Sequence, residues 1–93
     1  MNIDFEKEAY DEIYLNSKIY NKHYTDIRYF LVWEYVMKIL SVDKSSKILD
    51  LGCGPGHLAE MLHDKEFKSY TGIDFSKVAI EQARIKTPSY IYL

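Results

Sequence analysis

Three glycines, Gly52, Gly54 and Gly56, lie within five residues, and the sequence patterns on either side of them differ in period. Residues 47–51 form a short apolar run with the length of a β-strand, whereas residues 57–63 carry apolar side chains at helical spacing. A strand that turns sharply into a helix while its backbone approaches a ligand needs residues without a Cβ atom. The glycines therefore predict a strand, loop and helix unit whose loop contacts a ligand.

The same alternation continues towards the C-terminus. Residues 69–73 predict a second strand, Ser76 is a suitable N-cap for a helix that ends near residue 86, and residues 90–93 predict the start of a third strand. The sheet face of that helix is expected to carry the apolar residues Val78, Ala79, Ala83 and Ile85. Alternating strands and helices of this length predict right-handed crossovers between parallel strands. The expected fold is α/β, a Rossmann-like parallel sheet with helices on both faces, incomplete at about three strands.

Two helical patterns precede this unit, at residues 4–15 and 25–40. Six of the nine tyrosines lie in the first 35 residues. Aromatic residues at helical spacing are usually packing residues, and the alternative is a lid over a ligand. The predicted organisation is an N-terminal helical cap over residues 1–46 and the first half of a Rossmann-like domain over residues 47–93.

Charge indicates what the glycine loop binds. Asp50 lies at the end of the first strand and would repel a pyrophosphate, while Asp74 follows the second strand and can accept hydrogen bonds from both hydroxyls of a ribose. Neither G-x-x-x-x-G-K-[ST] nor G-x-G-x-x-G is present, since His57 stands where the last glycine of the second motif would be. These features favour a nucleoside with cationic groups. S-adenosylmethionine (SAM) has a ribose, an ammonium, a sulfonium and no phosphate.

Residues 48–56 and 70–76 together resemble the first two motifs of the class I SAM-dependent methyltransferases. The resemblance implies that Asp50 lies near the methionine amino group, that Asp74 holds the ribose hydroxyls and that Phe75 packs beside the adenine. The cofactor-binding set expected from it is Asp50, Gly52, Cys53, Gly54, Gly56, Asp74 and Phe75. From the N-terminal helices, the candidates to reach the methionine end are Tyr14, Tyr20, Tyr24 and Arg28. The implied activity is transfer of the sulfonium methyl group to an acceptor that the sequence does not identify, and no catalytic residue is assigned.

Composition excludes several other classes of function. Twelve Lys and Arg against fourteen Asp and Glu give a formal charge of −2, which does not indicate binding to nucleic acid or to an anionic membrane. The longest apolar stretch, residues 29–37, is interrupted by Glu34 and is too short to span a bilayer. A single cysteine and an acidic N-terminus favour a cytoplasmic protein. The three histidines lack metal-ligand spacing, and no metal site is predicted.

Two other interpretations remain open. The family has a larger sheet, so this chain is expected to be the N-terminal part of a longer domain and to transfer methyl groups poorly alone. A non-catalytic half-domain that binds cofactor weakly, or that associates with itself or another chain through open sheet edges, is the first alternative. A nicotinamide dehydrogenase domain is the second, and it would require a pyrophosphate beside Asp50.

Overall fold

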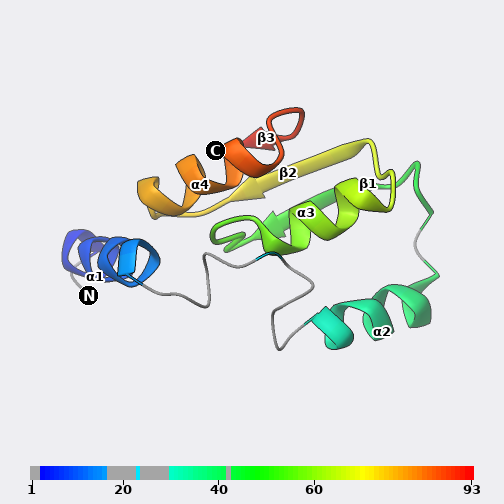
Figure 1. The fold of residues 1–93 in the computed structure, drawn as a ribbon, viewed down its shortest axis with the longest axis horizontal. Helices are drawn as coiled ribbons and strands as arrows, with labels where there is room; N and C mark the ends of the chain where they lie inside the picture. The colour runs from blue at the N-terminus through cyan, green and yellow to red at the C-terminus, as the bar shows by residue number, and fades with distance from the viewer. Residues whose placement is uncertain (1–2, 17–22, 24–29, 42) are drawn as a thin grey trace.

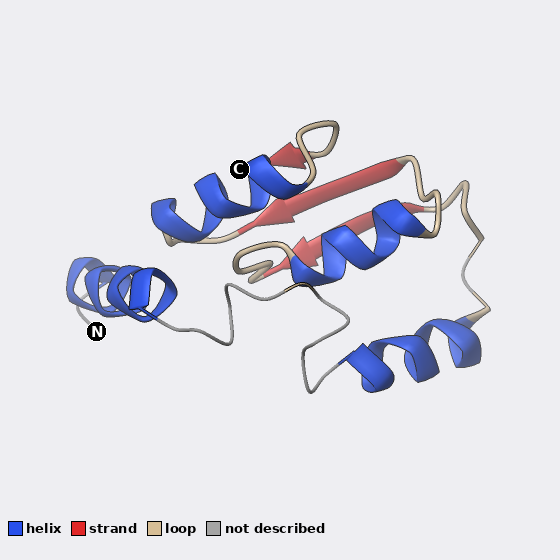
Figure 2. Cartoon of the chain, viewed as in Figure 1, coloured by secondary structure: helices blue, strands red, loops and turns tan. Residues whose placement is uncertain are grey.

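The computed structural model describes the whole chain except residues 1–2, 17–22, 24–29 and 42. Its elements in chain order are α1 (Ile3–Asn16), α2 (Phe30–Leu40), β1 (Lys47–Leu51), α3 (His57–Asp64), β2 (Ser69–Ile73), α4 (Lys77–Lys86) and β3 (Ile91–Tyr92) (Figures 1 and 2). Each predicted strand and helix is therefore present. The start of the second helical pattern lies outside the described residues, as do the candidate residues Tyr20, Tyr24 and Arg28.

The three strands form one parallel sheet in the order β1, β2, β3. Lys47 pairs with Ser69 and Leu51 with Ile73, so β1 and β2 are in register along their full length, and Thr71 pairs with Ile91. The predicted Rossmann-like parallel sheet of three strands is confirmed. Parallel strands place their carboxyl ends at one edge of the sheet, and this edge carries the glycine loop and Asp74.

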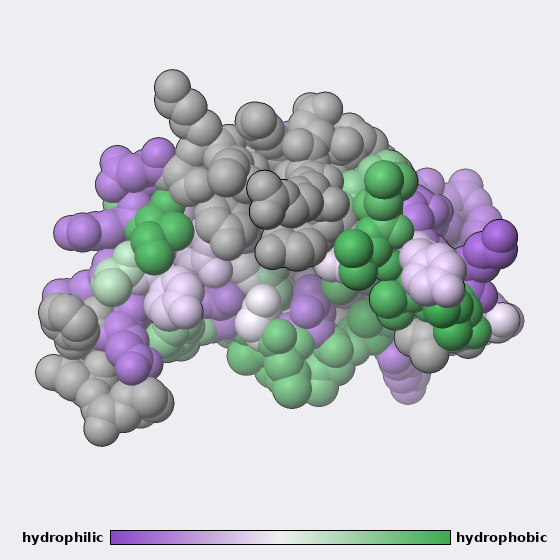
Figure 3. All heavy atoms as spheres, turned by 90° about the horizontal axis from the view of Figure 1, so that it is seen from below, coloured by the Kyte–Doolittle hydropathy of each residue, from purple (hydrophilic) through white to green (hydrophobic). Residues whose placement is uncertain are grey.

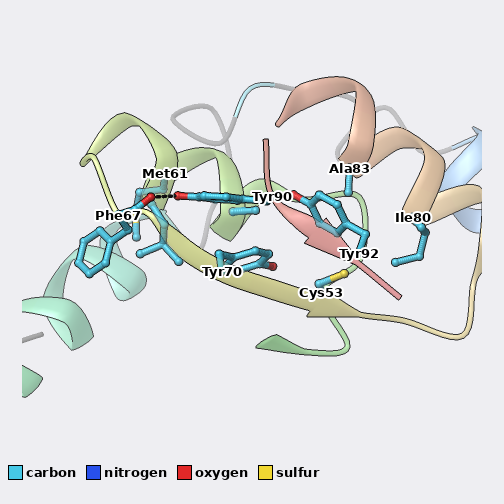
Figure 4. Close-up of a cluster of buried hydrophobic side chains, with 10 residues drawn as sticks. Cys53, Met61, Phe67, Tyr70, Ile80, Ala83, Tyr90 and Tyr92 are labelled. Carbon is cyan, nitrogen blue, oxygen red and sulfur yellow. Dashed lines mark hydrogen bonds between the residues drawn. The ribbon is translucent and has the colours of Figure 1, made fainter. Parts of the chain in front are cut away.

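One face of the sheet is packed against α3 and α4. Its buried side chains form an aromatic layer in which the rings of Tyr70 and Tyr90 stack with centroids 4.8 Å apart, and Tyr92 lies beside them (Figure 4). The helices add buried residues to the same core: Ala59, Met61 and Leu62 from α3, and Ala79, Ile80 and Ala83 from α4. Ile85, which the sequence pattern assigned to the sheet face of α4, is instead 82% exposed, because the helix buries the side containing residues 79, 80 and 83.

The opposite face of the sheet is open in the part of the chain that the structure describes. Leu49, Leu51, Ile91 and Leu93 are 58–74% exposed there. Figure 3, viewed from the side on which β1 lies, shows hydrophobic side chains gathered along the lower margin of the molecule. Helices were expected on both faces. The two crossover helices instead share one face, because two right-handed crossovers that advance in the same direction across a sheet place their helices on the same side.

The N-terminal helices pack against the α/β unit at two different places. Helix α1 lies against α4, and the Asp11 carboxylate accepts hydrogen bonds from the Ser76 hydroxyl and, at 3.4 Å, from the Val78 amide. Helix α2 packs three half-buried residues, Phe30, Trp33 and Met37, against the core. Both helices therefore attach to the Rossmann-like unit, and the boundary at residues 46 and 47 stays a prediction. No described helix has the length and apolar character required to cross a membrane.

Candidate functional site: the glycine loop at the carboxyl ends of the strands

The loop between β1 and α3 turns through three residues with left-handed backbone conformation. The φ angles are +75° at Gly52, +58° at Gly54 and +93° at Gly56, values that residues with a Cβ atom adopt only at a cost in conformational free energy. The amides of Gly52 and Cys53 donate to the Ile73 carbonyl at 2.7 and 3.0 Å, which fixes the loop to the end of β2. The predicted sharp turn from strand to helix is confirmed.

The glycines do not all serve the same purpose. A Cβ atom at Gly56 would lie 2.9 Å from the Cβ of Ala83, so this glycine permits the close approach of the loop to α4. A Cβ at Gly54 would lie 3.4 Å from the Tyr14 hydroxyl oxygen. The side chain of Tyr14, which belongs to α1, therefore covers the loop at this point. A Cβ at Gly52 would meet no atom of the described residues within 4 Å. Gly52 is therefore the position at which the loop backbone lies beside open space that a ligand can enter.

Asp74 connects the second strand to the glycine loop. Its Oδ2 accepts a hydrogen bond from the Gly54 amide at 2.9 Å, and its Oδ1 accepts one from the Ser76 amide at 2.8 Å. The hydroxyl of Ser76 in turn accepts the Ala79 amide at 3.1 Å, which confirms Ser76 as the N-cap of α4. Each carboxylate oxygen has a second lone pair, so the carboxylate has acceptor capacity beyond these two bonds.

Asp50 lies on the covered face of the sheet, half-buried, and accepts a hydrogen bond from the Tyr70 hydroxyl at 2.7 Å. Burial raises the pKa of the Asp50 carboxyl above its ordinary value of 3.8, the Tyr70 hydrogen bond opposes the rise, and the carboxylate of Asp74 adds to it. The carboxylate of Asp74 is thus close enough to act on that of Asp50. Two carboxylates in one partly desolvated region favour a cation between them.

Asp50 allows a test of that interpretation. Its pKa is higher in the folded chain than in the unfolded chain, so stability falls as the pH rises from 3.8 through the folded pKa and stays at the lower level above it. Replacing Asp50 by asparagine should therefore raise the free energy of unfolding at pH 7, because the amide oxygen still accepts the Tyr70 hydroxyl and no charge is buried. The same change should weaken binding of a cationic ligand by about tenfold.

Denaturant unfolding at pH 7 measures the change in the free energy of unfolding, and titration calorimetry at the same pH measures the change in ligand affinity. Asp64→Asn removes an equal charge from an exposed site at the end of α3, and it is the matched control. A variant at position 50 that is less stable than the parent chain at pH 7, with unchanged ligand affinity, would contradict the assignment.

The predicted site residue Cys53 belongs to the loop, and its side chain is buried. Its Sγ donates to the Gly54 carbonyl at 3.5 Å, and a Cβ atom at Gly72 would lie 2.9 Å from that sulfur. Burial raises the pKa of the Cys53 thiol to about 12, and the nearby carboxylates of Asp50 and Asp74 contribute to the rise. A thiol that stays protonated at neutral pH is not a nucleophile, so the part of Cys53 available to a ligand is its backbone.

Phe75 and two tyrosines of α1 form an aromatic cluster next to the loop. The ring centroid of Phe75 lies 5.2 Å from that of Tyr10, and the Tyr10 and Tyr14 rings are 6.2 Å apart. Phe75 is 42% exposed, whereas Tyr14 is buried against the loop. The side-chain amide of Gln82 donates a hydrogen bond to the Tyr14 carbonyl at 3.2 Å, which holds this turn of α1 in place. Tyr10 and Tyr14 therefore pack beside the loop, and their action as a lid over a ligand stays a prediction.

Three further residues of the site were not singled out from the sequence. Tyr70 holds Asp50, Gly72 leaves room for Cys53 and for the Tyr92 ring, and Asp11 docks α1 on α4. Strand alternation could have identified Tyr70. Ile48 pairs with Tyr70, and Asp50, two residues further along β1, points to the same face of the sheet as both. No local signal identifies Asp11, whose partners lie more than sixty residues away. Among the described residues, no group of three or more potential ligands for a metal comes together.

Comparison with known proteins adds independent information. The model of a family described as "Methyltransferase domain" matches residues 42–89, which include the loop, Asp50 and Asp74. The trans-aconitate 2-methyltransferase of Enterobacter sp. is 40% identical over 50 residues, which are 53% of this chain and 20% of that protein. The mRNA cap guanine-N(7) methyltransferase of Eremothecium gossypii is 29% identical over 89 residues, covering 90% of this chain and 21% of that protein. The chain thus spans about a fifth of the length of these relatives.

Solved structures agree on the fold. A SAM-dependent methyltransferase from Anabaena variabilis superimposes with a TM-score of 0.67 at 20% identity, over 98% of this chain and 37% of that one. A TehB-like SAM-dependent methyltransferase from Corynebacterium glutamicum gives a TM-score of 0.58 at 19% identity, over 97% of this chain and 45% of that one. In both cases the likeness covers nearly all of this chain and less than half of the larger protein.

Proposed function

Because the chain belongs to the methyltransferase domain family, we propose that it binds SAM at the glycine loop and supplies the cofactor-binding part of a cytoplasmic SAM-dependent methyltransferase. The observation that carries the proposal is the position of two acidic side chains, Asp50 and Asp74, beside a loop whose backbone is open at Gly52. A cationic nucleoside without phosphates matches both the charge and the open backbone.

Each residue of the site has a role in this proposal. Asp50 accepts the ammonium of the methionine part, and the Tyr70 hydroxyl orients its carboxylate. Gly52, Cys53 and Gly54 present backbone to the ligand, while Gly56 sets the distance between the loop and α4. Asp74 accepts the ribose hydroxyls with its remaining lone pairs. Phe75 packs beside the adenine.

The chemistry that SAM supplies is an electrophilic methyl group on a sulfonium. The residues of this chain contribute binding, alignment and exclusion of water, the main protein contributions expected in such a transfer. Tyr14 and Tyr10 contribute to the last of these, because they close the α1 side of the loop. The two curated relatives are named for different acceptors, trans-aconitate and an mRNA cap guanine. Family membership therefore does not select the methyl acceptor of this chain.

Calorimetric titration with SAM and, separately, with NAD tests the proposal against the dehydrogenase alternative. We expect saturable binding of SAM and much weaker binding of NAD, whose pyrophosphate would lie against Asp50. Tighter binding of NAD than of SAM would reject the proposal and support a dinucleotide site. Absence of heat with either ligand, in a chain shown by circular dichroism to be folded, would also reject it.

The open face of the sheet supports a second candidate function, association with another copy of the chain. Four large apolar side chains are exposed on that face, and β1 forms an edge of the sheet with no neighbouring strand among the described residues. If two copies pack through this open face, Leu49→Lys should shift a dimer to monomer in sedimentation velocity, because a charge would be buried in the contact. Ile85→Lys, on the exposed side of α4, is the matched control. A parent chain that remains monomeric up to about 100 μM, well above micromolar affinities, would exclude this function.

A further inference from the structure

A cavity of about 740 Å³ opens at the end of the molecule opposite the glycine loop. It lies between α2, the connection that precedes β1, and the chain that follows α3. These segments adjoin the amino ends of the parallel strands, whereas the loop and Asp74 lie at the carboxyl ends. Five residues of β1 separate the two ends by about 16 Å. The cavity is therefore distinct from the proposed SAM site and too far from it to hold a methyl acceptor.

The lining of the cavity combines apolar side chains with an excess of positive charge. Met37 and Phe67 provide apolar surface, and Phe67 is itself only 5% exposed. Among the described residues, the charged side chains that line the cavity are three lysines, Lys38, Lys44 and Lys65, and one acid, Glu34. The volume lies within the range of known small-molecule sites, about 300 to 1,000 Å³.

Two of the three lysines have acidic partners. Lys65 Nζ lies 2.9 Å from the Glu34 carboxylate, and Lys44 Nζ lies 3.3 Å from Glu66 on the exposed rim. Within the described part of the chain, the side chain of Lys38 forms no ion pair. An ammonium without a partner at the edge of an apolar cavity is the natural contact for an anionic group whose body occupies the cavity.

We propose that this cavity binds an anionic amphiphile, a molecule with an apolar body and a single carboxylate or phosphate head. The apolar body would contact Met37 and Phe67, and the head would bind Lys38 with Lys44 nearby. A cationic ligand would be repelled by the Lys38 ammonium, whose charge no described carboxylate balances, and a neutral one would leave that ammonium without an ion-pair partner. A carboxylate head corresponds to a free fatty acid, and a phosphate head corresponds to a phospholipid headgroup.

Fluorescence of Trp33 provides the measurement. Trp33 is the one tryptophan of the sequence, lies half-buried on α2 and adjoins the cavity-lining residue Glu34. The probes are octanoate, octyl phosphate and octanol, each titrated into the chain. We expect saturable changes with the two anions and at least about tenfold weaker binding of octanol. A higher affinity for octyl phosphate would indicate the phospholipid headgroup, and a higher or equal affinity for octanoate would indicate the fatty acid.

Charge reversal at Lys38 provides the control. Lys38→Glu should weaken binding of both anions by about tenfold or more, while Lys77→Glu, an equal change of charge on an exposed part of α4, should leave it unchanged. Both positions are exposed, so neither variant is expected to unfold. Equal binding of octanol and the anions, equal losses in the two variants, or no saturable change with any probe would overturn the proposal. None of these outcomes depends on whether the chain binds SAM.

Discussion

Replacement of Asp74 by alanine is expected to weaken SAM binding by about 100-fold. The carboxylate is proposed to accept both ribose hydroxyls, and hydrogen bonds to a charged acceptor contribute about 1.5 kcal/mol each or more, so two of them account for about two factors of ten. The variant also loses the acceptor that holds the Gly54 amide at 2.9 Å, which loosens the loop around the ligand. Titration calorimetry of the parent chain and the variant measures the loss.

Two further variants separate this effect from a general loss of charge or fold. Glu81→Ala removes one negative charge from an exposed position on α4 and should bind SAM as the parent chain does. Asp74→Asn keeps the shape and one acceptor oxygen, and an intermediate affinity is expected. Thermal unfolding by circular dichroism shows whether each variant is folded at the temperature of titration. A folded Asp74→Ala chain with the affinity of the parent would remove Asp74 from the site.

The largest expected effect on stability is that of Gly56→Ala, a loss of about 3 kcal/mol. The new Cβ atom would lie 2.9 Å from the Cβ of Ala83 and 3.0 Å from its Cα, and an overpacked contact of this kind costs about 1–3 kcal/mol. The φ angle of +93° adds about 1–2 kcal/mol for a residue with a Cβ atom. Helix α4 packs against the core through Ala79, Ile80 and Ala83, so it cannot move away from the loop without losing these contacts. We expect the midpoint of thermal unfolding to fall by more than about 10 °C.

Gly52→Ala is the matched control for this prediction. Its φ angle is also positive, at +75°, but a Cβ atom there meets no atom within 4 Å in the part of the chain that the structure describes. The cost in stability should be about 1 kcal/mol from backbone strain alone, whereas SAM affinity should fall by about tenfold because the methyl group occupies the space beside the loop. Equal destabilisation by the two alanines would show that the close contact between residue 56 and Ala83 adds no cost beyond backbone strain.

The local features of the chain were predictable because short-range chemistry decides them. The glycines, the N-cap at Ser76 and the end of each strand follow from backbone freedom, capping and the change of period. The position of Asp74 beside the loop also followed, since the carboxyl ends of neighbouring parallel strands meet. These features contain most of the candidate site.

Features that depend on contacts between distant residues were not predictable. Periodicity assigned Ile85 to the core, but the close approach of α4 at Gly56 turns the helix so that Ala83 faces the loop and Ile85 faces outwards. The same holds for Tyr14, whose contact with the loop depends on docking of α1 through Asp11. A single sequence contains no signal for a contact across sixty residues between a carboxylate and a helix N-terminus. Helices cover only one face of the sheet because of the strand order, and the sequence pattern did not determine that order.

An adenosyl compound with cationic groups is proposed to bind between Asp50 and Asp74 against the glycine loop. Titration of the ¹⁵N-labelled chain with SAM, followed by amide chemical shifts, tests it residue by residue. We expect saturable shifts that are largest at the amides of Gly52, Gly54 and Phe75, with little change at Lys44 beside the distant cavity. Saturable shifts centred elsewhere, or no shifts at the loop at SAM concentrations that saturate the calorimetric signal, would show that SAM does not bind at the glycine loop.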